Sequence, residues 1–167
     1  MAKSNQTTLC YIERAGKYLM MHRVKKEKDI NKDKWVGIGG HFEADECPEE
    51  CLLRECREET SLKLTDYKLR GIITFISDRW QTEYMFLYTA TGFEGEVGEC
   101  DEGTLEWIDK RKVYELPVWE GDKIFFRLLE TRQDCFSLKL RYAGEALVEV
   151  LLDGKTVDGE TLISGTN

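Results

Sequence analysis

Three glutamates in one predicted helix, Glu55, Glu58 and Glu59, restrict most strongly what this chain can fold into. Residues 49–60 contain no glycine or proline and are rich in Leu, Arg and Glu, which favours a helix. Spacings of three and four residues place the carboxylates on one helical face, where like charges repel. A divalent cation would offset this repulsion, and carboxylate oxygens suit Mg²⁺ or Mn²⁺. The alternative is a solvated acidic face balanced by neighbouring arginines.

The segment before this helix favours the cation site. Residues 35–42 are apolar but include Gly37, Gly39 and Gly40, and glycines in a strand-like run indicate close approach of the backbone to another group. An acidic loop follows, and Pro48 stands where a first helical turn tolerates proline. A glycine-rich strand, an acidic loop and an acidic helix in series predict a site for metal and phosphate.

Composition excludes several classes of protein. A length of 167 residues predicts one domain, and a net charge of −8 argues against strong nucleic-acid binding. Neither a membrane-spanning apolar stretch nor a secretory signal is visible. The six cysteines form no CxxC pair, so we expect free thiols in a reducing compartment and a cytoplasmic protein.

The remaining pattern predicts one mixed α/β or α+β domain over residues 1–153, followed by a poorly ordered polar tail at 154–167. Strands are predicted at 7–12, 17–22, 69–76, 83–89 and 105–108, with a closing hairpin at 136–142 and 146–151. Residues 24–34 are predicted to form a solvated loop, and residues 109–116 and 119–130 to form helices.

From Gly40 the chain reads GHFEADECPEECLLRECREETSL, which resembles the Nudix box. That motif is Gly, five residues, Glu, seven residues, Arg-Glu, an apolar residue, any residue, Glu-Glu, any residue, Gly and an apolar residue. The matching positions are Gly40, Glu46, Arg54, Glu55, Cys56, Glu58, Glu59 and Leu62. Ser61 replaces the second glycine, which ends the helix and carries no ligand. The resemblance implies an α/β/α sandwich with a mixed sheet and the box helix packed on it.

The resemblance also implies roles for the acidic residues. Glu55, Glu58 and Glu59 would bind divalent metal, and one of them or a downstream acid would take the proton of the attacking water. The Gly39 carbonyl and a distal glutamate, Glu102, would complete the metal site; Asp101 competes with Glu102 because the alignment there is loose. Arg54 is assigned to the catalytic set because it would hold a helix glutamate in place. The alternative for Arg54 is a purely structural ion pair with Glu46.

Five further residues are implied to bind substrate: Arg23, Trp119, Asp122, Gly40 and Thr8. Trp119 would stack on the base and Asp122 would hydrogen-bond to it, whereas Arg23 would contact phosphate or base. Arg23 could instead be a surface arginine, and Trp119 a core anchor.

The segments 35–40, 99–102 and 119–126 resemble the oxidised-purine nucleoside triphosphatases of the family, and this resemblance implies an 8-oxo-dGTP diphosphatase-like activity. Val36 and Gly121 replace an asparagine and an aspartate that recognise the base there, so we expect looser discrimination. The predicted reaction is metal-dependent hydrolysis of a nucleoside triphosphate to monophosphate and pyrophosphate, by water attack at phosphorus.

The substrate would arrive as its Mg²⁺ or Mn²⁺ complex, and the protein would be a monomer or homodimer without membrane association. The alternatives are hydrolysis of a dinucleotide, a nucleotide sugar or an RNA 5′ end, and a non-catalytic nucleotide sensor. A sensor would be expected to lose the helix glutamates, which are all present here.

Overall fold

A computed structural model describes residues 4–165, and residues 1–3 and 166–167 lie outside the described part. The strands are β1 (Gln6–Arg14), β2 (Lys17–His22), β3 (Trp35–Val36), β4 (Lys63–Ser77), β5 (Glu83–Glu94), β6 (Thr104–Asp109), β7 (Phe136–Ala143), β8 (Ala146–Leu152) and β9 (Lys155–Thr156). The helices are α1 (Pro48–Thr60), a 3₁₀ turn η1 (Val113–Glu115), α2 (Glu120–Thr131) and α3 (Gly159–Ser164).

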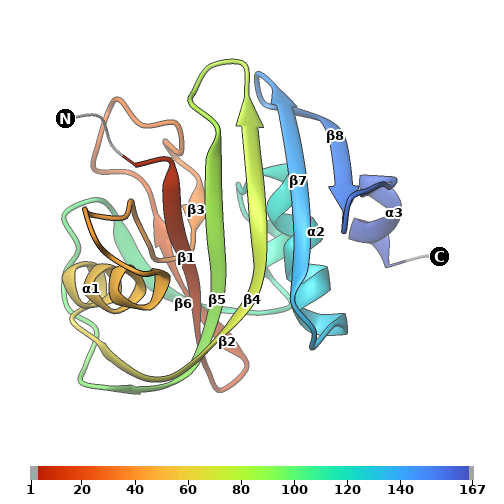
Figure 1. Cartoon of the computed structure of the whole chain (residues 1–167). Coiled ribbons are helices and arrows are strands. Elements are labelled where there is room, and N and C mark those ends of the chain that lie inside the picture. The colour runs from red at the N-terminus through yellow and green to blue at the C-terminus, as the bar shows by residue number, and fades with distance from the viewer. Residues whose placement is uncertain (1–3, 166–167) are drawn as a thin grey trace.

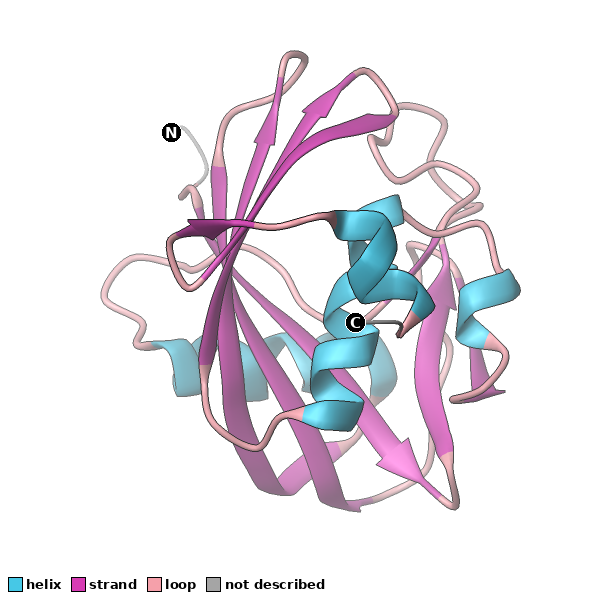
Figure 2. Cartoon of the chain, turned by 90° about the vertical axis from the view of Figure 1, so that its right-hand side faces the viewer, coloured by secondary structure: helices cyan, strands magenta, loops and turns pink. Residues whose placement is uncertain are grey.

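The strands form one mixed sheet in the order β3-β2-β1-β5-β4-β7-β8-β9, and β6 pairs with β2. The pairs β1–β5 and β4–β7 are parallel, whereas β1–β2, β4–β5 and β7–β8 are antiparallel. Figures 1 and 2 show α1 on one side of this sheet and α2 on the other. The predicted mixed α+β sandwich is therefore confirmed.

The alternation of side chains along the strands explains the two layers. In β1, Tyr11 packs in the core on the α2 side, whereas Cys10 and Ile12 pack in the core beneath α1. In β2, Met20 faces the α2 side and Leu19 the α1 side. A strand with a period of two residues that is apolar at both phases must be covered on both faces, which requires a helix on each side.

Two sequence predictions about the second half need correction. Residues 109–116 form no α-helix and contain only the turn η1, because the Asp109 side chain bonds the backbone N–H of Arg111 and favours a turn. The segment after Asp153 forms β9 and α3, although a poorly ordered tail was expected. Leu162 and Ile163 of α3 pack against the core, which provides the apolar burial that orders the segment. Within residues 4–165, no helix is long and apolar enough to cross a membrane.

One edge of β1 is shared by two segments of the chain. Its second half pairs with β2, with Ile12 opposite Leu19, whereas its first half bonds the glycine-rich segment. There Thr8 N–H donates to the Gly40 carbonyl at 2.9 Å and Cys10 N–H to the Ile38 carbonyl at 2.6 Å. A Cβ on Gly39 would lie 1.8 Å from the Thr8 carbonyl oxygen, so only glycine permits this approach. The close approach predicted from the glycines is a contact with β1.

The helix α1 ends at Ser61, which has a left-handed backbone with φ of 69°. Its N–H donates to the Arg57 carbonyl at 3.0 Å, the bond of a helix C-cap. The expected family glycine would adopt this conformation without strain.

Replacing Ser61 with glycine should therefore stabilise the protein by about 0.5–1 kcal/mol, because the strain of a left-handed residue exceeds the entropy that glycine adds to the unfolded chain. Urea unfolding measures the change, and activity should be unaffected. The matched control is Ser137→Gly in extended strand β7, which should lower stability. An unchanged or lower midpoint for Ser61→Gly would contradict the strain at this cap.

Candidate active site

The glycine-rich segment lies directly against the acidic face of α1. Gly39 N–H donates to Glu59 Oε2 at 3.1 Å. A Cβ on Gly40 would lie 2.5 Å from the carboxyl carbon of Glu55, so this glycine also leaves room for a glutamate. The structure thus brings together Gly39, Gly40 and two of the three predicted helix acids.

Arg54 organises the outer part of the same face. Its guanidinium donates to both oxygens of Glu46, at 2.7 and 2.8 Å, a two-bond geometry that fixes the guanidinium plane. It also donates to Glu55 at 2.8 Å, to Glu58 at 3.3 Å and to the His41 carbonyl at 3.0 Å. The hydrogen bonds to Glu46 and Glu55 raise the pKa of Arg54 above its usual range. Arg54 therefore connects the loop before α1 to the helix and fixes the positions of Glu55 and Glu58.

The second acidic element is Glu102, in the loop before β6. Arg23 donates to Glu102 Oε2 at 2.7 Å, and Lys26 donates to Oε1 at 3.0 Å. Burial alone would raise the pKa of Glu102, but the Lys26 and Arg23 cations outweigh it and hold this pKa below its usual value. Asp101 is exposed and forms no hydrogen bond or ion pair with the rest of the described chain.

Glu59 is the most deeply buried acid of the cluster, with 7% of its surface exposed. Its pKa is raised to about 9, first by burial and then by the negative charges of Glu102 and Glu55. The Gly39 N–H and the Arg23 charge act in the opposite direction. Burial also raises the pKa of Glu55. These mutual effects place Glu55, Glu59 and Glu102 in one electrostatic cluster, in which Glu55 and Glu102 have cationic partners and Glu59 forms no ion pair within the described residues.

A divalent cation fits this cluster chemically. Like carboxylates in a buried site favour protonation unless a cation neutralises them, and oxygen donors suit Mg²⁺ or Mn²⁺. Between residues 4 and 165, no three His, Cys, Asp or Glu side chains are gathered closely enough to hold a metal as they stand. In the described structure Glu55 and Glu58 pair with Arg54, while Glu102 pairs with Arg23 and Lys26. Metal binding would therefore require these carboxylates to exchange cationic partners.

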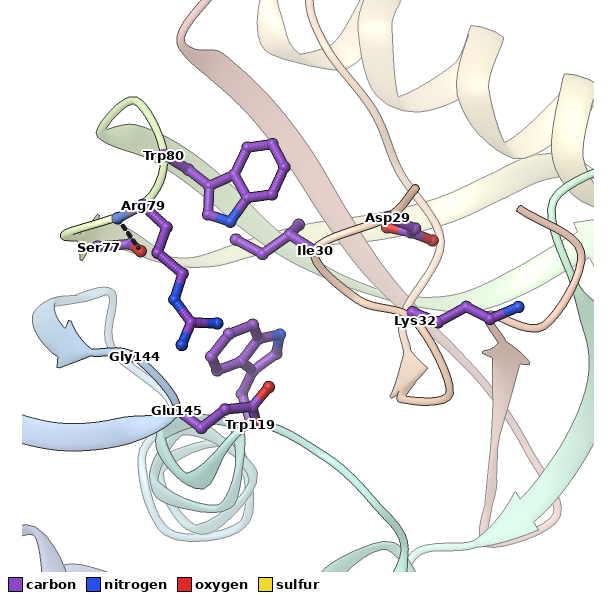
Figure 3. Close-up of a pocket in the computed structure, with 9 residues that line it drawn as sticks. All are labelled: Asp29, Ile30, Lys32, Ser77, Arg79, Trp80, Trp119, Gly144 and Glu145. Atoms are coloured by element: carbon purple, nitrogen blue, oxygen red, sulfur yellow. Dashed lines mark hydrogen bonds between the residues drawn. The ribbon is translucent and has the colours of Figure 1, made fainter. Parts of the chain in front are cut away.

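The predicted base-binding residues lie at the start of α2. Trp119 is 7% exposed, and its indole N–H donates to Asn31 Oδ1 at 2.7 Å. The ring lines a cavity of about 210 Å³, together with residues from the loop 23–34 and from two hairpin tips (Figure 3). Trp119 is thus both a core residue and a cavity wall, so the two interpretations of it are compatible.

Asp122 is buried behind Trp119 and does not line that cavity. The pKa of Asp122 is raised to about 8 because burial disfavours the carboxylate. The backbone N–H of Trp119 and the positive charge of Lys34 oppose this shift. Asp122 is therefore mainly protonated at neutral pH and can donate a hydrogen bond.

The other implied substrate residues have protein partners. Thr8 is buried, with its hydroxyl 3.5 Å from Cys51 Sγ, and its backbone positions Gly40. Arg23 donates to Asp29 at 2.7 Å as well as to Glu102, so it is not a free surface arginine.

Sequence reasoning missed the residues that the loop 23–34 and the hairpin tips contribute. It treated that loop as a solvated segment, whereas Asn31 fixes Trp119 and Lys26 bonds Glu102. The missed cavity residues Arg79 and Trp80 lie between β4 and β5. A tryptophan in a polar turn was the available signal.

Comparison with known proteins identifies the family. The NUDIX domain matches residues 3–129. The chain belongs to the Nudix family. A curated relative, an uncharacterised Nudix hydrolase YvcI from Bacillus subtilis, is 31% identical over 127 residues, which covers 73% of this chain and 77% of the relative. The protein is therefore a Nudix hydrolase, a class that acts on small-molecule nucleotides and generally needs divalent metal ions.

Solved structures agree with this assignment. A MutT protein from Bacillus halodurans superposes with a TM-score of 0.78 at 29% identity, covering 90% of this chain and 98% of that chain. A MutT protein from Methanosarcina mazei has a TM-score of 0.67 at 20% identity, over 77% of this chain and 95% of that chain. The first supports a MutT-like hydrolase, and the second supports the fold.

Replacing Glu102 with alanine should weaken metal binding and lower activity by ~10-fold or more, because Glu102 belongs to the electrostatic cluster. The matched Asp101→Ala variant should behave almost like the wild type. Metal affinity by calorimetry and pyrophosphate release check the pair, with thermal unfolding as a test of integrity. A larger loss in Asp101→Ala would show that the neighbouring acid is the ligand.

The raised pKa of Asp122 predicts a pH dependence of stability. Between about pH 4 and pH 8 this carboxyl is ionised in the unfolded chain but protonated in the folded protein. The folded state then binds more protons, so the free energy of unfolding falls as pH rises through this range. Asp122→Asn removes this term, and its stability relative to the wild type should increase from about pH 4 to pH 8. Parallel urea-unfolding curves at every pH would contradict a buried neutral Asp122.

Proposed function

We propose that this Nudix hydrolase cleaves a nucleoside triphosphate, bound as its Mg²⁺ complex, to the monophosphate and pyrophosphate. The observation that carries the proposal is the buried acid cluster of Glu55, Glu59 and Glu102 against the Gly39–Gly40 backbone. Mn²⁺ is the alternative ion because it takes the same oxygen donors. The residues proposed to hold metal are Gly39, Glu55, Glu58, Glu59 and Glu102.

In this proposal each residue has a limited task. A divalent metal held by these residues would supply the positive charge that offsets the phosphoanhydride charges and would polarise the bridging oxygen. Arg54 positions Glu55 and Glu58, and Glu46 fixes Arg54. One of the box-helix glutamates, or a downstream acid, accepts the proton of the water that attacks phosphorus. Arg23 contributes positive charge beside the phosphates, which a protein of net charge −8 otherwise repels.

We assign the base to the Trp119 side of the site, where Asp122 lies buried and protonated outside the lining of the cavity. Val36 cannot hydrogen-bond, which supports looser selection of oxidised purines than an 8-oxo-dGTP diphosphatase would show. The six cysteines are free thiols, which supports a cytoplasmic location. We also propose that the protein is a monomer or a homodimer and that it does not bind nucleic acid strongly.

The experiment that tests the substrate class is a panel of NTPs, oxidised dNTPs, ADP-ribose, NADH and dinucleoside polyphosphates with Mg²⁺ and Mn²⁺. Release of pyrophosphate from a triphosphate supports the proposal. Cleavage of a dinucleotide or nucleotide sugar with no triphosphate activity favours the alternative enzymes. Nucleotide binding without any turnover favours a sensor.

Activity should require divalent metal and the acids of the box helix. Glu58→Gln and Glu59→Gln should each lower kcat by ~10²–10⁴-fold, the scale of losing a metal ligand or general base. The control Glu106→Gln changes an exposed acid on β6 and should leave turnover unchanged. Near-wild-type pyrophosphate release in both helix variants would reject the assigned site.

A further inference from the structure

The cavity beside Trp119 is built from four parts of the chain that are distant in the sequence: the loop 23–34, the β4–β5 tip, the N-cap of α2 and the β7–β8 turn. Asp29, Ile30 and Lys32 come from the loop 23–34. The other residues that line the cavity are Ser77, Arg79, Trp80, Trp119, Gly144 and Glu145. Figure 3 shows Arg79 and Trp80 on one side of the cavity and Trp119 with Glu145 on another. The β4–β5 tip and the β7–β8 turn are tied together by a bond of 3.0 Å from Gly144 N–H to Asp78.

The cavity has two aromatic walls of different character. Trp119 is fixed by its bond to Asn31, and Lys34 Nζ lies 4.7 Å from the ring centroid. Trp80 is 52% exposed and has no aromatic or cationic neighbour on its ring within residues 4–165. Exposed tryptophan rings are favourable surfaces for stacking a flat aromatic ligand.

Most polar groups around the cavity already have partners. Both oxygens of Glu145 accept from Lys34, at 3.1 and 2.8 Å, and Asp29 accepts from Arg23. Lys32 Nζ donates to the Val24 carbonyl at 3.1 Å. The Arg79 guanidinium, by contrast, has no hydrogen bond or ion pair with any residue of the described range 4–165. The free hydrogen-bonding capacity of the cavity is therefore a set of donors.

The cavity is connected to the hydrolytic acids by a short chain of ion pairs. Asp29 of the cavity holds Arg23 at 2.7 Å, and Arg23 holds Glu102 at 2.7 Å. Glu102 is itself one of the acids proposed to hold the metal. A ligand with its phosphates at the acids can therefore direct its other end toward Trp119 and Trp80.

Size restricts what that other end can be. The volume of about 210 Å³ is below the ~300 Å³ at which pockets for drug-sized molecules begin. The cavity can hold one planar ring system such as a base, but it is too small for the complete second nucleotide of a dinucleotide.

We infer that the cavity holds the base of the substrate between Trp80 and Trp119, and that Arg79 selects bases with adjacent carbonyl and ring-nitrogen acceptors, as in guanine. A guanidinium donates two parallel bonds to such a pair of acceptors, whereas adenine presents an amino donor at one of the two positions. The inference rests on the proposed nucleotide hydrolysis and adds Arg79 and Trp80 as its specificity-determining residues.

The test compares GTP and ATP hydrolysis by the wild type with that of Trp80→Ala, Trp80→Phe and Arg79→Ala. Trp80→Ala should raise KM for both nucleotides by about 5- to 100-fold, the range for losing one base–aromatic stack, with little change in kcat. Trp80→Phe should restore most of the affinity because it retains an aromatic face. Arg79→Ala should lower the ratio of kcat/KM for GTP over ATP by ~10-fold, the scale of one two-bond base contact.

Two controls separate base binding from general damage. Arg111→Ala removes an exposed guanidinium that pairs with Asp109, and it should leave the GTP/ATP ratio unchanged. Competitive inhibition by inorganic triphosphate, which has no base, should be equal in the wild type and Trp80→Ala. An unchanged KM in Trp80→Ala, or equal losses for GTP and ATP in Arg79→Ala, would overturn the inference.

Failure of the proposed function gives a different result. If the wild type cleaves no triphosphate, hydrolysis as proposed is wrong, and the cavity is then tested by calorimetric binding of GTP and ATP in the Glu58→Gln background. Weaker GTP binding on adding Trp80→Ala, with a GTP preference that Arg79→Ala removes, supports the base site without reference to turnover. Absence of these effects rejects it.

Discussion

The contact between the first half of β1 and the glycine-rich segment determines the rest of the site. Because Gly39 has no side chain, its backbone approaches the Thr8 carbonyl closely and continues the sheet where β2 has diverged. This places the Gly39 N–H at Glu59 and leaves room for Glu55 beside Gly40. A larger residue at either glycine would separate strand and helix, and the acids would lose their common backbone partner.

That arrangement concentrates negative charge, and the protein balances it with arginine and lysine. Arg54 crosses the outer side of the helix and joins Glu46 to Glu55 and Glu58. On the inner side, Glu102 pairs with Arg23 and Lys26. Glu59 is buried between these two groups, and among residues 4–165 the Gly39 N–H is its only hydrogen-bond donor, so burial and the neighbouring negative charges raise its pKa. The cationic partners therefore stabilise the folded metal-free protein at the place where a metal would replace them.

The sequence predicted what depends on local chemistry. The spacing of Glu55, Glu58 and Glu59 predicted the helix face, and the runs at 7–12 and 17–22 predicted the strands that the structure has as β1 and β2. It failed where distant contacts decide the outcome. Leu162 and Ile163 order α3 only because α2 offers them a surface, and Arg79 reaches Trp119 only through the meeting of two hairpin tips. Neither contact has a signature within a short window of sequence.

The loop 23–34 contacts both the cavity and the acid cluster, since its Asn31 bonds Trp119 and its Lys26 bonds Glu102. The hairpin tips, by contrast, bond to each other and to Lys34 of that loop around the cavity, and they project from the sheet at one end (Figure 1). Arg79 and Trp80 are exposed and make no contribution to either core cluster. Mutations at these tips can therefore accumulate without unfolding the protein or disturbing the hydrolytic acids. Over evolutionary time, such an architecture lets base specificity change through substitutions at the tips while the hydrolytic acids are inherited unchanged.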